Sequence, residues 1–338
     1  MTKAYKTSIV ALMSVAGAAA QAQDLIPVKF GTNWVPEAEH GGYYQGVANG
    51  YYAACGLDVE IVPGGPQVNN RAMMMAGKID FNMAGSLLEP FNAAVEGIPV
   101  KIVAAHFQKE PQVLMTHPGA AASFEDIKGL NQIFVADAGY QSFYQWMISA
   151  YGFAPELRVP YTFNPAPFVA DPLSAQQGYI TSEPFAVEQA GGFKPDIWVL
   201  ADLGFSTYAT LVETMAPTVE EKPEVVKCFV EASSLGWASY LYGDPAPGNA
   251  LIQTANPDMS SEQIAFSIQM MKDYGIVDSG TSLELGIGAM DPATIQDFYD
   301  KMVAAGVIGE GLDLTTIYTT EFSNTGVALA LKKELTGE

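Results

Sequence analysis

The order of hydrophobic and polar positions along the chain predicts strands and helices in alternation. Short runs that alternate every second residue predict strands, and longer runs with apolar residues three or four apart predict helices. In the first part of the chain, the expected strands are 28–31, 57–62, 79–83 and 100–105, with helices at 42–54, 68–76 and 87–95. Strands and helices that alternate with short loops form a mostly parallel sheet with helices on both faces.

A second series of the same kind follows, and the character of the chain then changes. Strands are expected at 133–136, 157–162, 178–182 and 197–200, with helices at 140–150 and 185–190. Beyond residue 215 the pattern predicts three long amphipathic helices, at 219–242, 261–274 and 292–305. The extended stretches 113–117 and 207–212 would carry the chain between two lobes.

We therefore expect two α/β lobes joined by two crossings, with a hinge and a ligand cleft between them. Residues 23–115 and 208–338 would form the first lobe, and residues 116–207 the second. The chain has 338 residues, which exceeds the length at which a single core usually stops growing. Ligands of open α/β sheets collect at the carboxyl ends of strands and at helix N-termini, so the cleft should lie there.

The N-terminus has the layout of a secretory signal peptide. Lys3 and Lys6 precede an uncharged run from residue 7 to residue 22, which ends in Ala20-Gln21-Ala22. The run is shorter than the roughly 20 residues that a membrane-spanning helix needs. These features predict export and cleavage after Ala22. The segment contains no cysteine for lipid attachment, so the mature chain is expected to be free in the periplasm.

The charge of the chain excludes two classes of partner. Removing residues 1–22, which carry two lysines and no acids, takes the formal net charge from −21 to −23. Such acidity argues against nucleic acid and anionic lipid as partners. No later segment is long and apolar enough to predict membrane insertion.

Two cysteines, Cys55 and Cys228, leave two possibilities open. Export would permit a disulfide between them. They lie far apart in the sequence, however, and each lies in or beside an apolar helical pattern. The pattern therefore favours two buried free thiols over a disulfide.

The sequence contains none of the common catalytic motifs. It has no Gly-x-Ser-x-Gly, no His-Glu-x-x-His, no Cys-x-x-Cys and no phosphate-binding Walker loop. The three histidines, His40, His106 and His117, lack metal-ligand spacing, and each one alone is more typical of a hydrogen-bonded structural histidine. We expect no enzyme activity, no cofactor and no metal site.

The segment 31–45, between the first strand and the first helix, concentrates chemistry that suits a ligand. Trp34 can stack on a planar ring, and Asn33 offers a donor and an acceptor. Glu37 or Glu39 can accept hydrogen bonds from an amino group or pair with a cation. The alternative is a helix start at which Glu caps amides and Trp34 lies in the core. The candidate contacts here are Asn33, Trp34, Glu37 and His40.

This segment also resembles a known family. The pattern Asn-Trp-x-Pro-x-x-Glu-His-Gly-Gly-Tyr-Tyr-Gln at residues 33–45, with Gly-Leu-Asp-Val at 56–59 and Gly-Lys-Ile-Asp-Phe at 77–81, resembles the periplasmic solute-binding proteins of ABC importers. It is most similar to the branch for thiamine pyrimidine precursors, whose relatives bind sulfonates, nitrate and riboflavin. The resemblance implies a type II periplasmic-binding-protein fold, a permease and an ATPase as partners, and a monomeric receptor.

The resemblance adds candidates from both lobes. Residues 178–185 are similar to the family segment at which the second lobe supplies a carboxylate, which points to Glu183, with an ordinary helix N-terminal Glu as the alternative. Phe163 and Phe168 are possible cleft aromatics, although the core is the usual place for either. The further candidates that precede or begin helices are Gly85, Ser86 and Tyr140.

The scarcity of arginine bears on the charge of the ligand. The chain has two, Arg71 and Arg158, and neither lies in the segments expected at the cleft. Anion sites commonly use the arginine fork, so a neutral or cationic N-heterocycle is favoured over a sulfonate. Sulfonate, nitrate and riboflavin stay as alternatives. The family resemblance also includes a fungal-type pyrimidine synthase, but the cysteine-rich motif of that enzyme is missing here.

Overall fold

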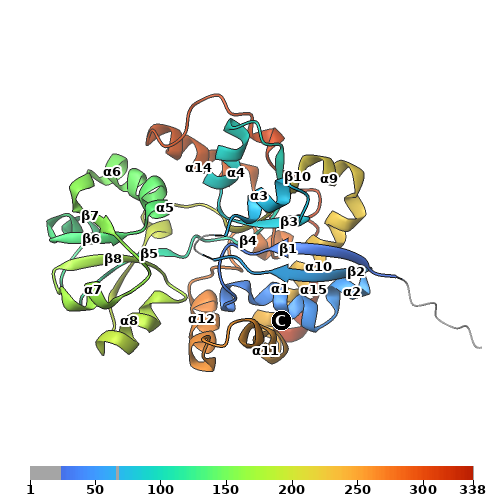
Figure 1. The fold of residues 1–338 in the computed structure, drawn as a ribbon, viewed down its shortest axis with the longest axis horizontal. Coiled ribbons are helices and arrows are strands. Elements are labelled where there is room, and N and C mark those ends of the chain that lie inside the picture. The colour runs from blue at the N-terminus through green and yellow to red at the C-terminus, as the bar shows by residue number, and fades with distance from the viewer. Residues whose placement is uncertain (1–23, 66–67, 338) are drawn as a thin grey trace, which may run out of the picture.

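Two α/β lobes lie side by side in the computed structural model, which describes residues 24–65 and 68–337 (Figure 1). Each lobe contains one five-stranded sheet, with strand order β2-β1-β3-β10-β4 in the first and β7-β6-β8-β5-β9 in the second. The two-lobed α/β fold class expected from the sequence is confirmed. Within these described ranges, no helix is long and apolar enough to cross a membrane. The expected signal peptide at residues 1–22 lies outside the described residues.

The sheet of the first lobe is parallel on one side and antiparallel on the other. Its strands are β1 (Ile26–Gly31), β2 (Leu57–Val62), β3 (Phe81–Ser86), β4 (Val100–Phe107) and β10 (Ala209–Met215). β1 pairs in parallel with β2 and β3, whereas β10 pairs antiparallel with β3 and β4. The parallel strands β1 and β3 end at one edge, so the loops after them meet there.

The helices of the first lobe follow the expected pattern, with breaks where backbone chemistry requires them. The helix expected at 42–54 is divided because Gly50 adopts a left-handed conformation, with φ of 70°. The helix expected at 219–242 is divided at Pro223, which lacks a backbone N–H. The helices are η1 (Ala38–His40), α1 (Gly41–Ala48), α2 (Tyr51–Ala54), α3 (Asn70–Met75), α4 (Leu88–Val95), α9 (Ala216–Glu221), α10 (Pro223–Tyr242), α11 (Ala246–Ala255), α12 (Ser261–Asp273), α13 (Ser282–Leu285), α14 (Pro292–Ala304), η6 (Leu314–Thr316) and α15 (Leu329–Thr336).

The second lobe has a smaller sheet with short helices around it. Its strands are β5 (Gln112–Thr116), β6 (Gln132–Val135), β7 (Arg158–Pro160), β8 (Ser174–Tyr179) and β9 (Asp196–Val199). Its helices are η2 (Phe124–Gly129), α5 (Asp137–Gly139), the π-helix η3 (Tyr140–Tyr144), α6 (Gln145–Tyr151), η4 (Pro155–Leu157), α7 (Ala166–Ala170), α8 (Glu183–Gly191) and η5 (Leu200–Leu203).

The strand expected at 178–182 is displaced, because β8 begins at Ser174 and ends at Tyr179. The next residues turn into α8, because the N–H of Ser182 donates to the carbonyl of Tyr179. The strand pattern therefore ends where Glu183 begins a helix, and this turn positions a candidate ligand contact.

The chain passes between the sheets at residues 108–111 and 204–208. The stretches 113–117 and 207–212, expected to be the crossings, instead lie largely in β5 and β10. β5 pairs with β8 and β9, so the expected lobe boundary after residue 115 falls inside a strand of the second sheet. The extended apolar pattern of each stretch reflects burial within a sheet, since all five residues of β5 are buried.

The buried helix α10 organises the core of the first lobe. Gly236 lies against α1 so closely that an added Cβ would be 2.1 Å from the Gly42 carbonyl oxygen. The side chain of Trp237 packs beside Tyr43 at a ring-centroid distance of 5.9 Å. The glycines thus let α1 and α10 pack closely, and this contact fixes the loop that precedes α1.

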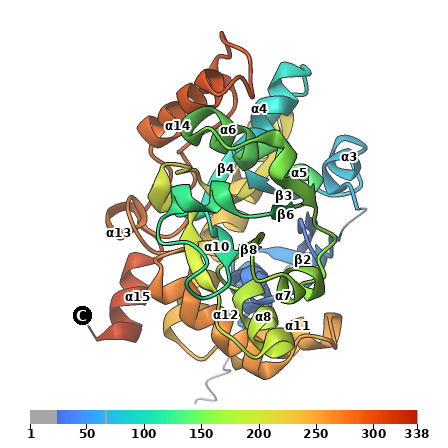
Figure 2. The same ribbon diagram turned by 90° about the vertical axis from the view of Figure 1, so that its left-hand side faces the viewer.

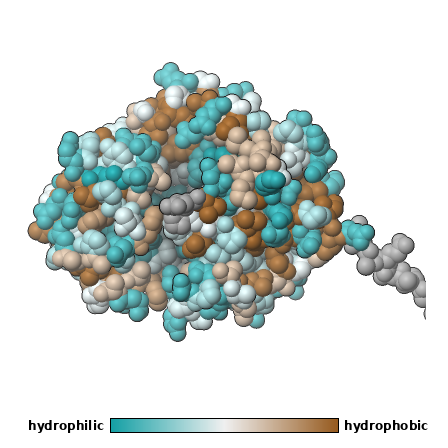
Figure 3. Space-filling view, in the orientation of Figure 1, coloured by the Kyte–Doolittle hydropathy of each residue, from teal (hydrophilic) through white to brown (hydrophobic). Residues whose placement is uncertain are grey.

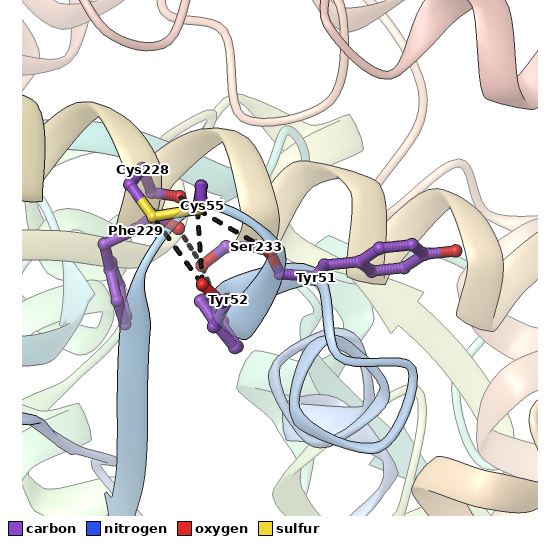
Figure 4. The surroundings of a disulfide bond; sticks show 6 residues. All are labelled: Tyr51, Tyr52, Cys55, Cys228, Phe229 and Ser233. Carbon is purple, nitrogen blue, oxygen red and sulfur yellow. Dashed lines mark hydrogen bonds between the residues drawn. A yellow bond between two sulfur atoms is a disulfide. The ribbon is translucent and has the colours of Figure 1, made fainter. Parts of the chain in front are cut away.

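A disulfide joins Cys55 to Cys228, so the expectation of two free thiols is wrong (Figure 4). Cys55 follows α2, and α2 packs on α10 with the ring of Tyr52 stacked on Phe229. The packing brings the two Cα atoms to 5.8 Å, which suits a disulfide. Residues 173 positions apart in the sequence become neighbours through this helix contact.

A candidate ligand site between the lobes

The loop after β1 presents Trp34 at the edge of the first sheet. The N–H of Gly64 donates to the Trp34 carbonyl over 3.1 Å, and the Thr32 hydroxyl donates to the same oxygen over 2.9 Å. An added Cβ at Gly64 would lie 2.2 Å from the Thr32 carbonyl oxygen. Only glycine therefore allows the two loops to approach this closely, and the approach leaves Trp34 half-buried.

Trp34 meets an aromatic side chain of the second lobe. The ring of Phe163 lies 4.9 Å from that of Trp34, and Tyr161 lies 5.3 Å from Phe163. Phe163 is exposed and has a left-handed backbone, with φ of 60°, which is a strained conformation for a side chain of this size. A planar ligand beside these rings would have π-faces available from both lobes.

Phe168, the other aromatic considered for the cleft, lies in the core. Its side chain is fully buried, and its ring is 4.8 Å from the ring of His117. The His117 Nε2 hydrogen bonds to the Phe168 carbonyl. Both side chains therefore have structural surroundings inside the second lobe.

Three carboxyl groups from the two lobes are coupled electrostatically. Burial raises the pKa of Glu37, and the nearby charges of Glu39 and Glu183 raise it further. Burial raises the pKa of Glu39 to about 7, with a contribution from Glu183, although the Thr181 hydroxyl partly lowers it. Burial also raises the pKa of Glu183. Glu37 and Glu39 belong to the first lobe and Glu183 to the second, so the three form an acidic group that spans the two lobes.

Glu183 is held in place by the turn between β8 and α8. Its Oε2 accepts hydrogen bonds from the Tyr179 N–H at 2.7 Å and from the Ser182 hydroxyl at 2.8 Å. An added Cβ at Gly178 would lie 2.5 Å from the Glu183 Cβ, so glycine is needed there. The carboxyl group is thus fixed by its own neighbours at the N-terminus of α8.

Glu37 and Glu39 are held by the loop that leads into α1. The side chain of Asn256 donates to the Pro36 carbonyl over 2.8 Å. Glu39 is 4% exposed, and Glu37 is half-buried. The backbone at this point is therefore tied to the segment after α11.

The two lobes also touch through α8 and α12. The hydroxyl of Ser267 in α12 donates to the Thr181 carbonyl over 2.7 Å, and the rings of Phe185 and Phe266 are 5.6 Å apart. Figures 1 and 2 both show α8 beside α12. The surface is hollowed between the lobes on the face drawn in Figure 3. These contacts hold the acidic group and the aromatic pair at the boundary between the lobes.

The buried side chain of His40 forms a hydrogen bond with Asn33. Its ring is 1% exposed, burial lowers its pKa to about 3, and it is therefore neutral. The Nε2–H donates to the Asn33 Oδ1 over 3.2 Å. Asn33 is exposed, so this bond orients its amide at the surface of the site.

Gly85 and Ser86 lie at the end of β3, next to Asn33. The Gly85 N–H donates to the Glu89 Oε1 over 2.8 Å, and an added Cβ on Gly85 would be 3.6 Å from the Asn33 Nδ2. Ser86 is half-buried at the same strand end. The structure thus brings Asn33, Gly85 and Ser86 together at one sheet edge.

Tyr140 has its contacts within the second lobe. Its ring lies 5.2 Å from the Arg158 guanidinium and 5.5 Å from the ring of Tyr144, both within the second lobe. Among the described contacts, none joins Tyr140 to Glu37, Glu39 or Glu183.

Tyr179 and Glu110 are coupled electrostatically to the acidic group, although neither was among the candidates from the sequence. Burial raises the pKa of Tyr179, and so do the charges of Glu110, Glu89, Glu183 and Glu37. The only sequence signal was the position of Tyr179 four residues before Glu183. Glu110 had no local signal, because its proximity depends on the path of the first crossing.

Arg71 lies beside the site, but its charge is already paired. Its Nε and Nη2 donate to the two oxygens of Glu213 over 2.7 and 2.8 Å. It also lies 3.5 Å from Glu89, and it lines a cavity of about 720 Å³ in the first lobe.

In the described ranges, no group of three His, Cys, Asp or Glu side chains could hold a metal ion. The site therefore offers negative charge and aromatic faces.

The acidic group predicts a loss of stability at mildly alkaline pH. A carboxyl whose pKa is raised in the folded state stabilises the fold while protonated, and this stability disappears as the pH rises through the folded-state pKa. Buried His40 and His106, with pKa lowered to about 3, act oppositely, but only below their unfolded-state pKa of about 6.5.

Raising the pH from about 6.5 to about 8 should therefore lower the melting temperature of the unliganded protein, with Glu39 alone contributing about 1 kcal/mol. Thermal melts across this range measure the effect, and Glu39→Gln should flatten the slope. A slope that is equally steep in Glu39→Gln would contradict the assignment to this carboxyl.

Comparisons with known proteins agree with the architecture. The family model described as NMT1/THI5 like matches residues 37–246. The riboflavin-binding protein RibY of Chloroflexus aurantiacus is 23% identical over 308 residues, which are 87% of this chain and 85% of that protein.

Two solved structures resemble the chain over most of its length. The CA3427 gene product of Candida albicans, described as having the generic periplasmic binding protein fold, has a TM-score of 0.61 and 19% identity, with 88% of this chain and 97% of that one covered. The periplasmic sulfonate-binding protein SsuA of Methylobacillus flagellatus has a TM-score of 0.59 and 18% identity, with 93% and 97% covered. The chain belongs to the NMT1/THI5-like family and has the two-lobed periplasmic-binding-protein fold.

Proposed function

We propose that the chain is an extracytoplasmic solute-binding receptor of an ABC importer. It binds a small neutral or cationic N-heterocycle, such as a thiamine pyrimidine precursor, between its two lobes. The observation that carries this proposal is the acidic group of Glu37, Glu39 and Glu183, which comes from both lobes. It is linked to the ring pair of Trp34 and Phe163 through Tyr161, because burial and the charge of Glu183 raise the pKa of Tyr161, whose ring lies 5.3 Å from that of Phe163.

The electrostatics favour a solute that donates hydrogen bonds or carries positive charge. The pKa shifts of these three carboxyl groups are caused by burial, by the charges of other carboxylates and by hydrogen-bond donors. A ligand N–H or a ring cation would stabilise the ionised carboxylates, whereas an anion would add to the repulsion. The two arginines have other partners, since Arg71 pairs with Glu213 and Arg158 pairs with Asp137.

The aromatic pair favours a planar solute. Trp34 and Phe163 come from different lobes, and flat rings stack on such faces with a gain of about 0.5 to 1.5 kcal/mol beyond area burial. Asn33 adds one donor and one acceptor at the same sheet edge. An aminopyrimidine fits all three features, because it stacks, donates its amino hydrogens to a carboxylate and accepts at its ring nitrogens.

The position of the site between the lobes supports a receptor role. A solute that contacts residues of both lobes stabilises their closed arrangement, and closure around a ligand is the usual motion of this fold. The contact between Ser267 of α12 and Thr181 marks where the lobes meet. Recognition of the closed form by a permease would then deliver the solute, in agreement with the family resemblance.

Removing one side chain from each lobe tests the site. Trp34→Ala and Glu183→Gln should each weaken binding of an aminopyrimidine about ten- to a hundredfold, as expected for one stacking contact or one charge-assisted hydrogen bond. Titration calorimetry measures the affinities, and thermal melts without ligand verify folding. The matched control is Glu188→Gln, a partly exposed carboxylate of the same helix, which should bind normally. Unchanged affinity in both site variants would refute the proposed pocket.

A further inference from the structure

Glu110 lies in the first crossing between the lobes and is directed into the protein. It is 3% exposed, although it belongs to a connecting segment of four residues. Its neighbours on both sides have structural partners. Lys109 forms an ion pair with Asp202, and the Pro111 carbonyl accepts a hydrogen bond from the Ile180 N–H. The crossing is therefore anchored on either side of Glu110.

One oxygen of this carboxyl group has no hydrogen-bond partner among the described residues. The Oε2 of Glu110 is buried and unpaired. Burial raises the pKa of Glu110 to about 8, and the charge of Glu89 contributes to this rise. Buried polar atoms in proteins nearly always have a partner, because leaving one unpaired is costly. The Oε2 atom is thus suited to a donor that arrives from outside the protein chain.

Tyr179 connects Glu110 to the acidic group. Its backbone N–H donates to the Glu183 Oε2, and Tyr179 lies opposite Gln112, two residues after Glu110, in the pairing of β8 with β5. Burial raises the pKa of its phenol, and the charges of Glu110, Glu183 and Glu37 raise it further. Charges from the hinge, the first lobe and the second lobe therefore act on one side chain. Glu110 belongs to the same acidic surroundings as the proposed site.

We propose that Glu110 is a second acidic contact for the solute, at the hinge end of the site. The solute then carries two nitrogen donors, one that meets the group of Glu37, Glu39 and Glu183 and one that meets the Oε2 of Glu110. This inference rests on the proposed function and narrows its substrate class to N-heterocycles with a second N–H-bearing substituent.

Two matched probes separate this inference from the proposed function. One is an aminopyrimidine that carries an aminomethyl arm, and the other is the same ring with a methyl arm in its place. The wild-type protein should bind the aminomethyl probe about ten- to a hundredfold more tightly, which is the effect of one charge-assisted hydrogen bond. Glu110→Gln should lose most of this preference while it keeps its affinity for the methyl probe. Titration calorimetry provides both affinities.

A control variant and the possible outcomes decide whether Glu110 contacts the solute. Glu60→Gln removes an exposed carboxylate from β2 and should leave the preference unchanged. Wild-type protein that binds both probes equally well would overturn the role of Glu110 and leave the proposed function intact, whether or not Glu110→Gln folds. A preference that persists in folded Glu110→Gln would also overturn it. Failure of the wild-type protein to bind either probe would overturn both proposals.

Discussion

Replacing Arg71 with alanine is expected to destabilise the protein by about 3 to 5 kcal/mol. The Glu213 side chain is fully buried, and both of its oxygens accept hydrogen bonds from the Arg71 guanidinium. Asn82 donates to the same carboxylate but carries no charge. Without Arg71, Glu213 would be a buried carboxylate with no cation, and the cost of that state sets the size of the effect. Chemical denaturation measures the change in unfolding free energy.

Two further variants show whether the buried charge is the cause. Arg71→Ala combined with Glu213→Gln should recover part of the lost stability, because no unpaired charge remains. Lys29→Ala breaks an exposed ion pair with Glu60 and should change stability by no more than about 1 kcal/mol. A double variant that is less stable than Arg71→Ala alone would contradict this account.

Removing the disulfide is the second change with a large expected effect on stability. Replacing both Cys55 and Cys228 with alanine should cost about 2 to 5 kcal/mol of unfolding free energy, because the bond closes a long loop in the unfolded chain. The α2 end of the bridge lies on the side of the first lobe that faces away from the second lobe, so ligand affinity should not change (Figure 1).

Reductant provides the matched control for this prediction. The wild-type protein should lose a similar amount of stability when reduced, whereas the double alanine variant should be insensitive to reductant. Equal melting temperatures for oxidised and reduced wild-type protein would contradict a stabilising role for the bond.

Much of the fold could be predicted because its signals are local in the sequence. The alternation of strands and helices follows from hydrophobic periodicity, and the position of Trp34 follows from the rule that ligands meet the carboxyl ends of strands. The helix break at Pro223 also has a local cause. Glu183 came from the family resemblance, and its role as a ligand contact stays a prediction.

The features that could not be predicted depend on contacts between distant segments. The sequence could not pair Cys55 with Cys228, because only the packing of α2 on α10 brings them together. An extended apolar stretch such as 113–117 is equally compatible with a crossing and with a buried strand. Glu110 and Tyr179 meet only because the hinge runs beside the end of β8.

The central claim is that the site between the lobes binds a nitrogen-bearing ring through carboxylates. The most direct test is a calorimetric titration of the wild-type protein with two probes, an aminopyrimidine and the sulfonate of the same ring without its amino group. The account predicts saturable binding of the aminopyrimidine at one site and binding of the sulfonate at least about a hundredfold weaker, since the site repels anions. Tight binding of the sulfonate with no detectable binding of the aminopyrimidine would contradict it.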